Sequence, residues 1–233
     1  MQLTQDLATG PLDQLRILDL GCGEGVYAIE AGLRGADVLA IDARDERMRE
    51  GAECAARHGL RNVRFERGDA RELSAERAGS FDIVYCLGLL YHLDAPEVFP
   101  FLAAVRELCA GALIVDTLIS LEPDTEVTYL DRAYRGERTR EHGDDDPPAV
   151  RRQRLLRSID STFAFRFTRE SLVRALRDAG FPSVLECHAP PEPGKAADRI
   201  TLAAAGAEPV RISTYPWLEG IGEREIVRRL TSD

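Results

Sequence analysis

The feature that most constrains this chain is a short glycine-rich segment that follows an apolar run. Residues 17–25 read Ile-Leu-Asp-Leu-Gly-Cys-Gly-Glu-Gly, which indicates a buried strand, a turn with glycine at alternate positions and the start of a helix. Glycine is needed where the backbone adopts conformations closed to other residues, or where a ligand lies against bare backbone. Gly21, Gly23 and Gly25 together therefore predict a ligand-binding loop.

The remaining sequence alternates short apolar runs with longer helical patterns, which is typical of βα units that build a parallel sheet. We expect helices at residues 25–34, 44–58, 95–109 and 168–179. Asp94-Ala95-Pro96 predicts the start of the third helix, and Thr168 is expected to cap the fourth. We expect strands at residues 16–19, 37–41, 63–66, 81–86, 112–118, 183–187 and 198–204. The predicted fold is a doubly wound α/β fold with a seven-stranded sheet, mostly parallel, with one antiparallel strand in a C-terminal hairpin.

Three segments fall outside this regular pattern, although we expect residues 1–233 to form a single domain. Residues 1–15 are expected to form an N-terminal arm. Residues 120–160 are expected to form an insertion after the fifth strand, where regular patterning stops around the breaker cluster Gly143–Pro148. Residues 208–233 are expected to form a C-terminal extension with one amphipathic helix at 223–230, and a proline-rich loop at 190–194 is expected to join the last two strands.

Composition limits the classes of function. The 40 acidic residues outnumber the 30 basic ones and give a formal charge of -10, which disfavours non-specific binding to nucleic acid or to an anionic membrane. The five cysteines lack CxxC spacing, so we expect reduced thiols and no metal site. The sequence shows no signal peptide and no apolar run long enough to span a membrane, and we therefore expect a cytoplasmic protein.

The spacing Gly-x-Gly-x-Gly after Asp19 resembles motif I of the class I, Rossmann-like, S-adenosylmethionine-dependent methyltransferases. A dinucleotide-binding loop would instead have its last glycine where Val26 stands. The cofactor of these methyltransferases carries a cationic sulfonium and no pyrophosphate, so carboxylates near the glycines make electrostatic sense. The resemblance implies that Asp19 and the three glycines bind S-adenosylmethionine, and that S-adenosylhomocysteine (SAH) is the product.

Three further features stand in the order that this family shows. Asp42 ends the second strand, where its carboxylate can accept the two ribose hydroxyls. The resemblance assigns Asp69 and the backbone of Ala70 to the adenine edge. Residues 81–93 resemble the fourth-strand motif whose loop passes under the methionine part of the cofactor, and the resemblance implies that Cys86 contributes there.

The methyl acceptor is expected to bind near His92, which follows the fourth strand at the carboxyl edge of the sheet. His92 is the candidate general base and Tyr91 is a candidate substrate-binding residue, and an alternative is that both only shape the pocket floor. In the insertion, Tyr129, Tyr134 and His142 are candidates for acceptor recognition or, alternatively, surface residues. The arginines between residues 132 and 157 suit either an anionic acceptor or an ion-paired surface.

These features predict a methyltransferase that acts on oxygen or nitrogen of a small-molecule metabolite, with its oligomeric state left open. Residues 87–93 and 116–118 also look like the catalytic domain of tRNA wobble-uridine carboxymethyltransferases, so a tRNA-modifying enzyme is the alternative. A non-catalytic S-adenosylmethionine-binding protein is a second alternative. A nicotinamide-dependent dehydrogenase is a third, against which Val26 argues.

Overall fold

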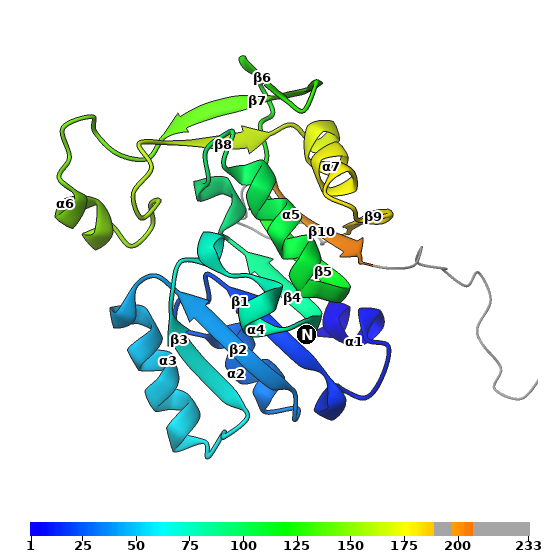
Figure 1. Cartoon of the computed structure of the whole chain (residues 1–233). Helices are drawn as coiled ribbons and strands as arrows, with labels where there is room; N and C mark the ends of the chain where they lie inside the picture. The colour runs from blue at the N-terminus through cyan, green and yellow to red at the C-terminus, as the bar shows by residue number, and fades with distance from the viewer. Residues whose placement is uncertain (189–196, 207–233) are drawn as a thin grey trace, which may run out of the picture.

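The computed structural model describes residues 1–188 and 197–206 (Figure 1). The proline-rich loop expected at 190–194 and the extension expected at 208–233, with its helix at 223–230, lie outside the described residues.

A seven-stranded sheet forms the centre of the molecule. Its spatial order is β3-β2-β1-β4-β5-β10-β9, and β10 runs antiparallel to both of its neighbours while the inner pairs are parallel. This arrangement confirms the predicted doubly wound α/β fold and its single antiparallel strand. The strands are β1 (Arg16–Leu20), β2 (Asp37–Asp42), β3 (Val63–Arg67), β4 (Phe81–Leu87), β5 (Cys109–Leu118), β9 (Ser183–Cys187) and β10 (Arg199–Ala205).

Helices cover both faces of this sheet and bury a separate apolar cluster on each face. On one face, α5 and α7 pack on the sheet, and Figure 1 shows α5 crossing in front of the strands. On the other face, α2 lies against β1 and β2, and Thr4 of α1 is hydrogen-bonded to Tyr85 of β4. None of the helices in the described ranges has the length and apolarity needed to span a bilayer. The helices are α1 (Gln2–Leu7), α2 (Val26–Gly32), α3 (Asp45–Arg57), α4 (Ala75–Ala78), α5 (Val98–Leu108), α6 (Pro148–Gln153) and α7 (Arg169–Asp178), with 3-10 turns at Leu12–Gln14, Ala70–Glu72 and Leu90–His92.

The helix ends follow the predicted signals in one case and depart from them in another. The Thr168 hydroxyl accepts a hydrogen bond from the Ser171 backbone N–H at 3.2 Å, which confirms the predicted cap of α7. The predicted start of α5 at Asp94-Ala95-Pro96 is wrong, because the helix begins at Val98. The Asp94 carboxylate instead accepts the Ala95 N–H and pairs with Arg138 from the insertion.

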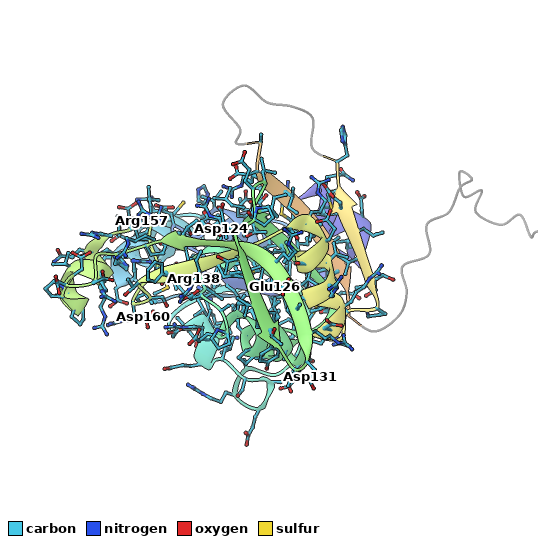
Figure 2. All side chains as sticks on the ribbon, turned by 90° about the horizontal axis from the view of Figure 1, so that it is seen from above. Asp124, Glu126, Asp131, Arg138, Arg157 and Asp160 are labelled. Carbon is cyan, nitrogen blue, oxygen red and sulfur yellow. The ribbon has the colours of Figure 1, made fainter. Side chains whose placement is uncertain are left out.

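The insertion is more regular than its sequence indicates. It forms most of a second, three-stranded antiparallel sheet in the order β6-β7-β8, built from Thr125–Tyr129, Arg132–Arg140 and Phe163–Phe167. Figures 1 and 2 show this small sheet above the seven-stranded sheet, next to α7. The expectation that regular structure stops over 120–160 is therefore wrong.

Residues 141–162 connect β7 to β8 and are called the strap below. The strap contains the short helix α6, which extends away from the small sheet in Figure 1. Its two ends are held together because Arg140 and Phe163, the residues that flank it, are paired in the sheet. The strap is thus a long loop with fixed ends.

Candidate functional site

The glycine loop lies at the carboxyl edge of the central strands. The backbone N–H groups of Gly21 and Cys22 both donate to the Ile41 carbonyl, at 2.8 and 3.0 Å, so the loop is fastened to the end of β2. Gly21, Gly23 and Gly25 all have positive φ angles, of 70°, 54° and 72°. The three positions therefore need glycine for their backbone conformation.

Gly25 has an additional packing role. A Cβ atom placed on this residue would lie 2.3 Å from the Phe65 ring, which is well inside contact distance. Gly25 thus lets the start of α2 approach β3, while Gly21 and Gly23 line the cavity above the loop. The predicted ligand-binding loop is in place, but its third glycine serves packing.

Asp42 joins the end of β2 to the glycine loop. Its carboxylate accepts the Gly23 N–H at 3.0 Å and the Arg44 N–H at 2.9 Å. The Asp42 side chain also lines two adjoining cavities, one over the glycine loop and one toward β3. Asp42 is therefore held rigidly where a ribose could meet it.

Asp19 is the least satisfied polar group of the site. Its side chain is 2% exposed, and its Oδ2 atom has no hydrogen-bond partner in the part of the chain that the structure describes. Burial, and to a lesser extent the negative charge of Asp42, raise the pKa of Asp19 to about 7. Because an orphaned carboxyl at a cavity wall is costly, the site suits a ligand that brings a cation or a donor to this oxygen.

Asp69 and Ala70 follow β3 and line the cavity, as expected. However, the Asp69 carboxylate is already bound by Arg71, whose guanidinium contacts both of its oxygens and comes within 2.6 Å. Burial alone would raise the pKa of Asp69, but these hydrogen bonds outweigh it and hold the pKa below its usual value. Arg71 also pairs with Asp160 of the strap at 2.7 Å.

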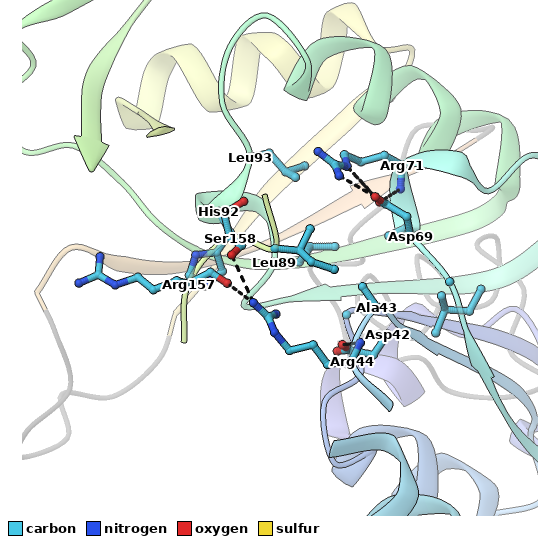
Figure 3. A pocket seen from close by; sticks show the side chains of 15 residues that line it. Asp42, Ala43, Arg44, Asp69, Arg71, Leu89, His92, Leu93, Arg157 and Ser158 are labelled. Carbon is cyan, nitrogen blue, oxygen red and sulfur yellow. Dashed lines mark hydrogen bonds and ion pairs between the residues drawn. The ribbon is translucent and has the colours of Figure 1, made fainter. Parts of the chain in front are cut away.

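Beside a cavity of about 560 Å³ that touches neither the glycine loop nor His92, two neighbouring cavities lie between the sheet edge and the strap. The larger, of about 280 Å³, lies over the glycine loop, and a smaller one, of about 70 Å³, extends toward β3 (Figure 3). Both are bounded by Asp42, Arg44, Leu89, His92 and Arg157. They form one continuous candidate site at the carboxyl ends of the strands, where ligands of open α/β sheets bind.

Arg44 fastens the strap over this site. Its guanidinium donates to four strap carbonyl oxygens at 2.7–3.3 Å, two of which are visible in Figure 3. Arg44 and Arg71 stand in the same local sequence, because Asp42-Ala43-Arg44 begins at the last residue of β2 and Asp69-Ala70-Arg71 follows shortly after β3. Each Asp-Ala-Arg sequence thus offers a carboxylate at the cavity and an arginine to the strap. The four carbonyls belong to Arg152, Arg154, Arg157 and Ser158.

His92 is paired with a residue that the sequence did not indicate. Its Nδ1 atom lies 3.1 Å from Oε2 of Glu141, which is only 5% exposed. The same carboxylate oxygen accepts the Ser158 N–H at 2.6 Å. Burial alone would raise the pKa of Glu141, but the hydrogen bonds from His92 and Ser158 lower it. Nε2 of His92 is therefore the imidazole nitrogen that Glu141 does not contact.

Two other residues singled out in the sequence also lie near this pair. Tyr91 lines the larger cavity, and its ring centroid is 4.4 Å from that of His92. His142 is 1% exposed, and its Nε2 atom is 2.8 Å from the Ser158 carbonyl oxygen. His142 therefore supports the strap from inside.

Three predicted ligand residues lie elsewhere. Cys86 is 1% exposed within the apolar core, where burial raises the pKa of its thiol to about 12, and the loop after it lines the cavity instead. Tyr134 is buried and donates its hydroxyl hydrogen bond to Asp178 at 2.7 Å. Tyr129 stacks on Phe99 with ring centroids 4.5 Å apart. Both tyrosines belong to an aromatic core beneath the small sheet and line neither cavity.

The arginines of the insertion are largely ion-paired. Arg138 pairs with Asp94, Arg140 with Asp144 at 3.0 Å, and Arg154 with Asp146 at 2.7 Å, and Arg132 pairs with Asp178. Figure 2 labels one of these residues, Arg138, which belongs to β7 of the small sheet. Of the two interpretations left open by the sequence, the ion-paired surface describes these four arginines.

Comparison with known proteins shows what the central region is similar to. Residues 17–111 match the family model described as a methyltransferase domain. The match covers 95 of the 233 residues and shows a similarity of this region to that family. The matched range contains the glycine loop, Asp42, Asp69 and His92, whereas Glu141 and the strap lie beyond it.

A curated relative of the methyltransferase domain is the ubiquinone biosynthesis O-methyltransferase of Acinetobacter baumannii (strain AYE). It is 34% identical over 91 residues, which are 39% of this chain and 38% of the relative. The chain thus spans less than half the length of the curated relative that it matches.

Solved structures resemble a larger part of the chain. The N-terminal domain of EvdMO1, solved in the presence of SAH and D-fucose, has a TM-score of 0.70 and 23% identity and covers 88% of this chain and 80% of that one. A Burkholderia thailandensis 1,6-didemethyltoxoflavin-N1-methyltransferase has a TM-score of 0.58 and 21% identity over 83% of this chain and 72% of that one. At these identities the likeness establishes the fold.

Proposed function

We propose that the protein transfers the methyl group of S-adenosylmethionine to an oxygen or nitrogen atom of a small-molecule acceptor. The proposal rests on four features that lie together at one cavity. They are the glycine loop, Asp42, the unpaired Asp19 carboxyl and the His92–Glu141 pair. The matched domain family and the SAH-containing structural neighbours support the choice of cofactor. The neighbours named above act on or were solved with small molecules, which supports that acceptor class over tRNA.

The residues present fit the cofactor at both of its polar ends. Asp42 is held rigidly at the cavity wall and can accept ribose hydroxyls, and bare backbone of Gly21 and Gly23 permits close approach. The Asp19 carboxylate can receive the ammonium group of the methionine part, which would satisfy its unpaired oxygen. At the adenine end, Gly68 and Ala70 line the smaller cavity, and Arg71 must share Asp69 with any ligand donor.

The chemistry follows from this arrangement. The bound cofactor would supply an electrophilic methyl group whose sulfur leaves as a neutral thioether. His92 then takes the proton that the acceptor atom loses as it forms its new bond to carbon, and Nε2 is the nitrogen available for it. Glu141 holds the Nδ1 proton and stabilises the imidazolium, and the strap excludes water from the site.

Calorimetry and a methyl-transfer assay test the proposal. We expect the chain to bind SAH, and we expect Asp42→Ala to weaken that binding by about tenfold or more because two ribose hydrogen bonds are lost. We expect His92→Ala to lower kcat by roughly 100-fold while SAH affinity stays within about twofold. Absence of SAH binding, or binding of NAD in its place, would refute the cofactor assignment, and an unchanged kcat would remove His92 as the base.

A further inference from the structure

Exposed apolar side chains gather at the mouth of the larger cavity. Seven large apolar side chains in the described residues are exposed, and four of these line this one cavity. They are Val26 (65% exposed), Tyr27 (50%), Leu155 (43%) and Leu156 (77%). Single exposed apolar residues need no explanation, but a group of them around a concave site marks a binding surface.

The four side chains come from two separate elements. Val26 and Tyr27 are the first residues of α2, directly after the glycine loop. Leu155 and Leu156 belong to the strap, which Arg44 fastens through carbonyl groups on both sides of the two leucines. The hydrogen bonds of the strap thus keep two leucines in contact with solvent at the cavity, although burying them would stabilise the fold.

This apolar surface is connected to the candidate base. Leu156 is two residues from Ser158, whose N–H donates to Glu141 at 2.6 Å, and Glu141 binds His92. A molecule that lies against Leu155 and Leu156 is therefore beside the segment that fixes the imidazole. The apolar wall and the proton acceptor are built by the same strap.

The charges of the cavity select between acceptor atoms. Its lining carries four arginines, which are Arg44, Arg47, Arg157 and Arg199. Arg47 and Arg199 are neutralised by ion pairs with Glu24 and Asp116, at 2.6 and 2.5 Å. Arg44 and Arg157 therefore face Asp42 and Asp19, and burial raises the pKa of Asp19 to about 7. The bound sulfonium cofactor would add one more positive charge. This field disfavours a protonated amine and favours a hydroxyl that becomes negative as it reacts.

We propose that the acceptor is a neutral phenol carried on an apolar body, which lies between Val26–Tyr27 and Leu155–Leu156 and presents its hydroxyl to His92. This inference rests on the proposed function, because it concerns the second substrate of the same site. It goes further in choosing oxygen over nitrogen and an apolar molecule over a sugar or an amino acid.

The test measures binding separately from turnover. Naphthol and butylcatechol are titrated into the full chain saturated with SAH, with glucose, serine and a primary amine such as benzylamine as comparison compounds, and the affinity is measured by calorimetry. We expect both phenols to bind and the comparison compounds to bind at least about tenfold more weakly. With S-adenosylmethionine in place of SAH, we expect methylation of a phenol oxygen.

Matched variants locate the binding surface. Leu156→Asp should weaken binding of the phenols by roughly tenfold while SAH affinity stays within about twofold, and Leu156→Met should retain phenol binding. Leu130→Asp is the control, because Leu130 is 79% exposed at the β6–β7 turn and lines neither cavity. Both substitutions are at exposed positions, so folding is expected to be intact.

Two results would overturn the inference and leave the proposed function standing. One is SAH binding with tighter binding of glucose, serine or benzylamine than of either phenol. The other is phenol binding that Leu156→Asp and Leu130→Asp affect equally. Failure of the chain to bind SAH would instead refute the proposed function itself.

Discussion

The Glu141 carboxylate lies 3.1 Å from Nδ1 of His92 and joins two segments that are 49 residues apart in the chain. One segment is the turn after β4 in the matched domain, and the other is the first residue of the strap. The contact therefore connects the family's shared region to the part of this chain that its family model does not cover. Removing this contact should therefore lower the rate of methyl transfer while the affinity for SAH stays the same.

Replacing Glu141 with glutamine tests this connection. The amide keeps the size of the side chain but removes its charge, so we expect kcat to fall by about tenfold or more and SAH affinity to stay within about twofold. Combining Glu141→Gln with His92→Ala should cost little more than His92→Ala alone, because the two residues act as a unit. Glu126→Gln, at an exposed position of β6, is the control. Additive losses in steady-state kinetics would contradict a positioning role for Glu141.

Arg44 should control the mobility of the strap. Arg44→Ala removes hydrogen bonds to four strap carbonyls, so we expect trypsin to cleave after Arg152, Arg154 and Arg157 roughly threefold faster or more. Mass spectrometry of the fragments would locate the cuts. Arg64→Ala, which changes an exposed arginine on β3, should leave the cleavage rate unaltered. Equal rates for both variants would show that Arg44 does not hold the strap.

Asp19 should make stability depend on pH. Its folded pKa, about 7, lies above the ordinary value of 3.8, so the folded chain holds a proton that the unfolded chain releases between these two values. The contribution of Asp19 to the free energy of unfolding is therefore most favourable below about pH 4. It is lost as the pH rises to about 7, where the buried carboxyl gives up its proton. We therefore expect Asp19→Asn to stabilise the protein by about 2–4 kcal/mol at pH 8 and by little at pH 4.

Thermal unfolding of both proteins between these two pH values would measure the effect. The same substitution should weaken SAH binding at pH 8, because an amide cannot pair with an ammonium group as a carboxylate does. A stability difference that is the same at both pH values would show that folding does not raise the pKa of Asp19.

Gly25 is expected to be intolerant of substitution for a reason unrelated to ligands. Gly25→Ala forces a Cβ into the Phe65 ring and places alanine at a φ of 72°, so we expect a loss of about 2 kcal/mol or more in the free energy of unfolding. Phe65→Ala in the same chain should recover the part that is due to the clash. Denaturant unfolding of the two single variants and the double variant measures this coupling, and strictly additive losses would disprove the contact.

The seven-stranded sheet could be predicted because its signals are local. Each strand is a short apolar run between helical patterns, and the Thr168 cap and the glycine loop lie within a few residues of the structure they determine. The order of features along the chain indicated that the glycine loop, Asp42 and Asp69 lie together at one site, whereas Cys86 lies in the core. His92 was found in the same way, from its position just after a strand.

The small sheet and the strap contacts could not be predicted, because their partners are far apart in sequence. β7 contains one large apolar residue, Tyr134, among arginines and small residues, so it carries no alternating signal of its own. Its apolar partner surface comes from Phe165 and Phe167 of β8 and Phe99 of α5. The charged residues Arg44 and Glu141 looked like surface residues until the fold placed carbonyls and an imidazole beside them.

The pairing of Arg140 with Phe163 gives the strap a property that is useful for protein engineering. Because the two ends of residues 141–162 leave adjacent strands at a fixed separation, a loop of another length or sequence can be grafted there without altering the seven-stranded sheet. Such a graft exchanges Leu155 and Leu156 while the donor side keeps Asp19 and Asp42. Under the proposed function, a graft that retains Glu141 and Ser158 keeps the contact to His92 and changes the part of the acceptor wall that the strap supplies, while Val26 and Tyr27 stay in place.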